Sequence, residues 1–191
     1  MFTPRTQTLR NQSGFSLVEV LVAISLLLIA LVGPMTFFAR SSQSTEVAND
    51  RAIATFLAQE GAELIQKMRD DRTLEFFLEP DEDGWSQFQG QVSDCESDDG
   101  CGVSINDAGV VEVFSCLTDD CRLYYGGTGR ARYHHDDSSG EETPYTRTIQ
   151  LNFTDDREAE IISRVEWDST ALIEPQSVEV QTTIFNVYVA N

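Results

Sequence analysis

The stretch that decides the fold is residues 15–39, which read FSLVEVLVAISLLLIALVGPMTFFA. Its 25 residues include one acidic and no basic side chain, and residues 20–32 contain no polar residue except Ser25. A helix rises about 1.5 Å per residue, so this stretch would be roughly 37 Å long, enough to cross a hydrocarbon core of about 30 Å. The sequence therefore predicts a transmembrane helix over 15–39, with a buried core helix as the alternative.

The charges around this stretch predict its orientation. Residues 1–14 carry Arg5 and Arg10 and no acid, so they are expected in the cytoplasm, with the rest of the chain outside the inner (cytoplasmic) membrane. The whole chain has 13 Lys+Arg against 32 Asp+Glu, a formal charge of −19. This excess of acid argues against nucleic acid as a partner and against docking on an anionic membrane surface.

The start of the apolar stretch differs from that of an ordinary secretory signal. No A-x-A-like cleavage site follows the stretch, whereas a small residue, Gly14, precedes it. Glu19 lies near the start of the span, and a charge at the centre of a membrane helix costs about 2.5–3.5 kcal/mol, less near an end. Glu19 either reaches the interface or pairs with a cation at the same depth. Cleavage after Gly14 would create such a cation, the α-amino group of Phe15.

The sequence Gly14-Phe15-Ser16-Leu17-Val18-Glu19, with its short basic leader (1–14) and following apolar helix, resembles the class III signal of type IV prepilins and type II secretion pseudopilins. The resemblance implies that prepilin peptidase cleaves between Gly14 and Phe15 and that Phe15 becomes N-methylated. It also implies that Glu19 pairs with the N-terminus of a neighbouring subunit and sets the register of a filament. Pro34 matches the proline of pilin helices only loosely, because it falls slightly earlier in the helix.

Helical spacing continues beyond the apolar stretch. Apolar side chains recur at intervals of three, four and seven residues: Ile53, Leu57, Leu64 and Met68, with Phe56 and Ile65 beside them. Charged residues fill the other positions, so 40–78 is predicted to be an amphipathic helix that stops before Pro80 and packs under the rest of the chain. Gly61 costs about 1 kcal/mol relative to alanine and marks the place where this helix would break.

Residues 79–191 are predicted to form an extracytoplasmic head, and we use this name for them below. Residues 79–144 are rich in Asp, Glu, Gly and Ser, which predicts long loops with short strands at 110–116 and 122–125. Alternating apolar residues then predict strands at 145–153, 160–167 and 177–189, joined as an antiparallel meander. The predicted fold class is α+β, with a long N-terminal helix packed on a small antiparallel sheet. The last two strands also weakly resemble the heads of V-type minor pilins.

Four cysteines, Cys95, Cys101, Cys116 and Cys121, fall in the head. Four cysteines allow three pairings, of which the local one (95–101 and 116–121) would pin two loops. Zinc is the rival, but the separation of Cys95 from Cys101 exceeds the usual spacing of zinc ligands. An exported head favours disulfide bonds, because the compartment outside the inner membrane is oxidising.

No catalytic site and no metal site is predicted. The acidic clusters at 81–83, 94–99 and 119–120 are expected to be solvated loops, and 94–105 fails the EF-hand pattern. Calcium stays an alternative because some pseudopilins bind it. The run 134–137, HHDD, lacks a third ligand at helical spacing, and no hydrolase, phosphate-loop or dinucleotide motif occurs. We therefore expect neither an enzyme nor a cofactor.

The sequence thus predicts a minor pilin or pseudopilin that sits in the inner membrane and then enters a type IV pilus or type II secretion-like filament. The expected partners are prepilin peptidase, other pilins or pseudopilins through the N-terminal helix, and inner-membrane lipid. The rival function is a single-span, membrane-anchored extracytoplasmic binding protein outside any filament. The filament system, the adhesion target or cargo, and the choice between major and minor subunit stay open at this point.

Overall fold

The computed structural model is dominated by one long helix, α1 (Leu17–Leu78, 62 residues). The structure describes residues 14, 16–78, 83–106, 108–117, 120–127, 131–138, 140–168 and 174–187. The chain divides into two units, Met1–Thr45 and Glu46–Asn191, and α1 contributes to both. α1 is a single helix that continues through Pro34 and Gly61, so the break considered at Gly61 is absent.

Two short helices and seven strands follow α1 in the described part of the chain. They are α2 (Gly84–Gln91), the 3-10 helix η1 (Ser93–Glu96), β1 (Cys101–Ile105), β2 (Val111–Ser115), β3 (Arg122–Gly126), β4 (Arg132–His134), β5 (Gly140–Asp155), β6 (Glu158–Trp167) and β7 (Gln176–Phe185). The sequence analysis missed α2, η1, β1 and β4. A local signal for α2 existed, because Asp83 caps it by accepting a hydrogen bond from the Trp85 N–H at 3.1 Å.

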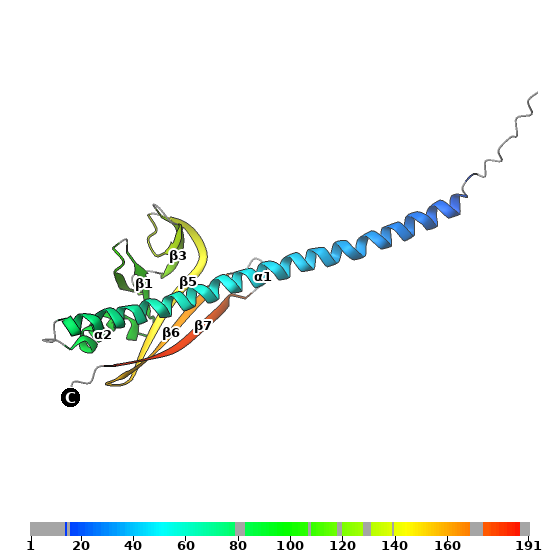
Figure 1. The fold of residues 1–191 in the computed structure, drawn as a ribbon. Helices are drawn as coiled ribbons and strands as arrows, with labels where there is room; N and C mark the ends of the chain where they lie inside the picture. Colours follow the sequence, from blue (N-terminus) through cyan, green and yellow to red (C-terminus); the bar gives the residue numbers. More distant parts are fainter. Residues whose placement is uncertain are drawn as a thin grey trace, which may run out of the picture. The chain divides into compact units, whose positions relative to one another are not determined.

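The strands form one antiparallel sheet around the long strand β5 (Figure 1). One edge of β5 pairs with β6 along its C-terminal part, and β6 pairs with β7, which gives the predicted meander. The other edge of β5 is shared: β1 pairs with it at Ile149, and β3 pairs with it from Gly140 to Thr146. β2 and β4 extend the sheet beyond β1 and β3.

β5 begins at Gly140, earlier than the predicted start at residue 145. The difference between the predicted and the observed start arises at Pro144. Proline cannot donate a hydrogen bond to a strand ladder, but it is tolerated at strand edges and bulges. The β3–β5 register shifts between Arg122↔Thr146 and Tyr124↔Glu142, and the pairing with β6 starts only at Tyr145. Pro144 therefore falls in the irregularity, and the strand continues on both sides of it.

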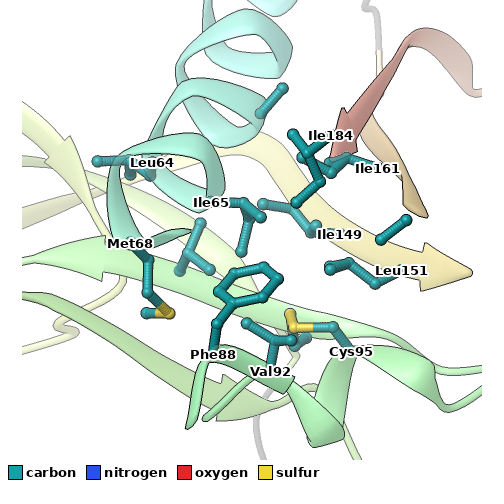
Figure 2. Packing of buried hydrophobic residues seen from close by; sticks show 14 of the residues in the cluster. Leu64, Ile65, Met68, Phe88, Val92, Cys95, Ile149, Leu151, Ile161 and Ile184 are labelled. Carbon is teal, nitrogen blue, oxygen red and sulfur yellow. A yellow bond between two sulfur atoms is a disulfide. The ribbon is translucent and has the colours of Figure 1, made fainter. Parts of the chain in front are cut away.

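The second half of α1 packs on one face of the sheet (Figure 1). Of the apolar residues predicted to face the sheet, Leu57, Leu64, Ile65 and Met68 are buried, whereas Phe56 is 70% exposed. The helix face instead contains small residues that the periodicity of large side chains did not reveal: Ala54, Ala58, Gly61 and Ala62. Figure 2 shows the centre of this core, where side chains of α1 meet those of α2, β5, β6 and β7.

Gly61 lets the helix approach the sheet closely. A Cβ atom at this position would lie 2.6 Å from Ser163 Oγ, 3.0 Å from Arg147 Cδ and 3.1 Å from Ile149 Cδ1. Distances this short are not tolerated without a shift of the neighbours, so the spacing between helix and sheet depends on the absence of a side chain here. Gly61 therefore has a packing role that outweighs its low helix propensity.

Arg147 ties α1 to the sheet from inside the core. Its side chain is 1% exposed and donates hydrogen bonds to the Leu57 carbonyl at 3.2 Å, the Val103 carbonyl at 2.8 Å and the Glu60 carboxylate at 2.9 Å. Burial lowers the pKa of Arg147, and the ion pair with Glu60 opposes that shift. This residue was not singled out from the sequence, although the alternation of the strand puts it on the same face as Ile149 and Leu151.

Candidate functional site

The N-terminal end of α1 carries the candidate processing site. α1 begins at Leu17, and the Val20 N–H donates to the Ser16 carbonyl at 3.2 Å to close its first turn. Glu19 lies in this first turn, where the partial positive charge of the helix end favours a carboxylate. Gly14 is exposed, and a Cβ added there would meet nothing within 4 Å. Phe15 and residues 1–13 lie outside the described residues, so the scissile bond and the methylated residue stay predictions.

The apolar part of α1 is uncovered along its length. Its most apolar window of 18 residues has a mean hydropathy of 2.5, and none of that window is buried. The largest exposed fractions include 76% for Leu17, 72% for Ile29 and 70% for Phe38. A core helix would be covered by its own chain, so this alternative fails. An apolar surface of this size needs lipid or other apolar helices around it.

Two polar side chains within this apolar stretch are satisfied by the helix itself. The Ser25 hydroxyl donates to the Leu21 carbonyl at 2.8 Å, and the Thr36 hydroxyl donates to the Gly33 carbonyl at 2.8 Å. Within the described ranges, Glu19 has neither an ion-pair partner nor a hydrogen-bond partner for its carboxylate. Because an unsatisfied charge is costly in hydrocarbon, Glu19 is the residue of this stretch that requires a partner from elsewhere.

Comparison with known proteins agrees with this geometry. Residues 9–33 match the family model for the prokaryotic N-terminal methylation motif. This match, together with the long apolar helix and the sheet, is consistent with a type IV pilin-like protein. The match spans Gly14, Phe15 and Glu19 and the first part of the apolar helix, and the helix and sheet fit a pilin-like architecture. No curated protein and no solved structure matches the chain.

The methylation motif has general implications for processing and anchoring. It implies processing by prepilin peptidase and pilin-type assembly in general. Together with the single apolar N-terminal helix it indicates anchoring in a membrane. Pilin-type proteins are typically structural and not enzymatic.

Both predicted disulfide bonds are present, and they adopt the local pairing. Cys95 pairs with Cys101, with Cα atoms 4.5 Å apart, and joins η1 to the start of β1. Cys116 pairs with Cys121, with Cα atoms 5.4 Å apart, and joins the end of β2 to the start of β3. The sequence left three pairings open, and the fold decides among them because each pair is brought together by adjacent elements. The bonds therefore fix the connections around the β1–β2 hairpin.

The acidic and histidine-containing segments do not gather into a metal site in the described ranges. Within them, no three or more His, Cys, Asp or Glu side chains are arranged to hold a metal ion. Residues 81, 82 and 119 lie outside the described residues, so calcium binding stays a prediction. His135 instead packs edge-on against Phe114, with ring centroids 4.9 Å apart, and its Nδ1 lies 3.0 Å from the Arg122 carbonyl. His135 lies in the loop that follows β4, and its ring belongs to the packing of the head.

Proposed function

We propose that the protein is a minor pilin or pseudopilin subunit of a type IV pilus or a type II secretion-like filament. The observation that carries the proposal is the methylation motif at 9–33. It lies at the start of an apolar helix whose most apolar window is not buried. The subunit would wait in the inner membrane with residues 1–14 in the cytoplasm and the head outside. It would then enter the filament through α1.

The chemistry of assembly follows from the position of Glu19. Cleavage between Gly14 and Phe15 would remove Arg5 and Arg10 and create a cationic α-amino group on Phe15. In a low-dielectric surrounding of packed helices, that amine and the Glu19 carboxylate of a neighbouring copy would each satisfy the other. Because other contacts between such helices are non-directional van der Waals packing, this one pair would set the axial register.

The head supports a location outside the cytoplasm. Two disulfide bonds pin it, and such bonds persist in oxidising compartments. Residues 79–191 contain 24 acidic residues, six arginines and no lysine, so this part lacks the cations that hold a segment on the cytoplasmic side. The strand ending in Trp167 and the threonine-rich β7 favour a head like that of V-type minor pilins within this proposal.

Two measurements test the proposal. Mass spectrometry of the protein from native membranes is expected to show a chain that begins at Phe15 and carries one added methyl group. Gly14→Val should abolish this processing, because the peptidase requires a small residue at the cut. An intact Met1 in the wild type would favour the rival function, an anchored extracytoplasmic binding protein that joins no filament.

The register role of Glu19 needs a separate variant. Glu19→Gln keeps the size and removes the charge, so it should be cleaved and membrane-anchored as the wild type is, yet fail to enter filaments. Glu19→Asp, which keeps the charge on a shorter side chain, serves as the matched control and should retain part of the incorporation. Normal incorporation of Glu19→Gln would show that the charge pair does not set the register.

A further inference from the structure

A row of two tyrosines and one glutamate crosses three neighbouring strands of the head. Tyr125 of β3 is opposite Tyr133 of β4 on one side and opposite Glu141 of β5 on the other. Residues directly opposite each other in an antiparallel sheet point to the same face, so the three side chains lie side by side. The rings of Tyr125 and Tyr133 have centroids 5.0 Å apart and are tilted by 54°.

This row is anchored in the core at one end and open to solvent at the other. Tyr133 contacts Tyr145 with ring centroids 6.2 Å apart, and Tyr145 contacts Trp167 at 6.2 Å. Tyr145 and Trp167 are 4% and 5% exposed, whereas Tyr125 is 47% exposed. The exposed ring of Tyr125 is therefore held by a series of aromatic contacts, which lowers the conformational entropy that this side chain would lose when a partner docks against it.

The carboxylate on this face is exposed. Glu141 is exposed and, among the residues that the structure describes, has no ion-pair partner. Its neighbour Glu142 points to the opposite face, where Arg122 pairs with it at 3.0 Å. Arg132 precedes Tyr133 and so also belongs to that opposite face. Tyr125 is thus beside a carboxylate for which the described residues provide no ion-pair partner.

We propose that the row Tyr133, Tyr125 and Glu141 is a docking surface for an arginine side chain of a second, more basic protein. A guanidinium stacks on the face of a tyrosine ring and pairs with a carboxylate through its fixed N–H groups, so one arginine satisfies both features. A second copy of this chain is a poor occupant, because its head carries 24 acids against six arginines and would be repelled. The surface belongs to the head and does not depend on the filament role of α1.

The test uses the full chain in nonionic detergent and a short peptide probe. The probe is an acetylated peptide of four arginines separated by glycines, and its control is the same peptide with citrulline, which is planar but neutral. Binding is followed by NMR or fluorescence titration, and emission of the buried Trp85 and Trp167 verifies that each variant is folded. We expect saturable binding of the arginine peptide and a loss of at least tenfold in affinity for the citrulline peptide.

Matched variants separate a specific site from general attraction to an acidic protein. Tyr125→Leu keeps the apolar volume and loses the ring face, and it should weaken binding about fivefold, whereas Tyr125→Phe should bind as the wild type does. Glu141→Gln should weaken binding several-fold, while Glu142→Gln, the same charge change on the opposite face, should change it less than twofold. Equal effects of Glu141→Gln and Glu142→Gln, or unchanged binding by Tyr125→Leu, would overturn the proposal. Equal binding of the citrulline peptide would do the same.

Discussion

Replacing Gly61 by alanine has two opposite effects on the free energy of unfolding that are similar in size, and the surroundings of Gly61 decide which is larger. In an open helix the change stabilises by up to about 1 kcal/mol, because alanine is the better helix former. At Gly61, however, the new Cβ would lie 2.6 Å from Ser163 Oγ and close to Arg147 Cδ and Ile149 Cδ1. Overpacking of a filled core costs about 1–3 kcal/mol. We therefore expect Gly61→Ala to lower the free energy of unfolding by about 1 kcal/mol.

The measurement is thermal or urea unfolding of the full chain in detergent, followed by tryptophan fluorescence. Trp85 and Trp167 are the two tryptophans of the chain and both are buried in the head, so their emission reports on the helix–sheet unit alone. For a domain of this size, 1 kcal/mol corresponds to a shift of roughly 2–4 °C in Tm. Gly90→Ala in α2 is the control, because nothing lies within 4 Å of an added Cβ there, and it should be neutral or stabilising.

A double substitution tests the cause. The nearest atom to the new Cβ is Ser163 Oγ, which is buried and has no hydrogen-bond partner in the described part of the chain. Ser163→Ala alone should therefore cost little, and combined with Gly61→Ala it should restore most of the lost stability. If Gly61→Ala stabilises as much as Gly90→Ala, or if Ser163→Ala gives no rescue, the close approach of α1 to β6 is not what requires glycine.

Three further predictions concern the head. Arg147→Met should lower the free energy of unfolding by about 3 kcal/mol, because three buried hydrogen bonds are lost. Glu60→Gln should lower it by only about 1 kcal/mol, since the amide oxygen still accepts a hydrogen bond from the guanidinium. Urea unfolding of both variants measures these losses. Burial, followed by the charge of Arg147, lowers the pKa of His135 to about 3 in the folded chain. Below about pH 6.5 the unfolded chain therefore binds a proton at this histidine and the folded chain does not. The free energy of unfolding should fall toward pH 5 by at most about 1.4 kcal/mol per pH unit. A His135→Gln variant should lack that slope, and an unchanged slope would contradict the assignment. Removing the Cys116–Cys121 bond by a double serine substitution should cost about 2 kcal/mol in urea denaturation, and a reductant should cost the wild type more than this, because it also breaks Cys95–Cys101.

The sequence analysis was most successful where a single periodicity decides the structure. The apolar stretch, the amphipathic continuation to Leu78 and the three strands of the meander follow from local patterns of 3.6 and two residues. It was least successful in 79–144, where α2, η1, β1 and β4 were missed. These elements are short and rich in polar residues, so their formation depends on contacts with β5 and on two disulfide bonds more than on their own propensities.

The N-terminal site stays a prediction from sequence, and sequence could supply that prediction because the chemistry of the site lies in one short motif. Gly14, Phe15 and Glu19 are within six consecutive residues, and the apolar helix that follows them predicts the membrane surroundings that their chemistry requires. By contrast, the row Tyr133, Tyr125 and Glu141 could not be found in this way, because strand register brings together residues from three strands.

By itself, the amino-acid sequence determined the apolar stretch and the methylation motif near the N-terminus, because hydrophobicity, charge and a cleavage motif act locally along the chain. Only the tertiary structure decided how closely α1 packs on the sheet, which residues carry that contact and how the cysteines pair. The physical reason is that packing depends on distances between residues far apart in the chain. Gly61 lies beside Ser163 and Arg147 in the fold although it is far from both in the sequence, so no short stretch of sequence contains all three residues.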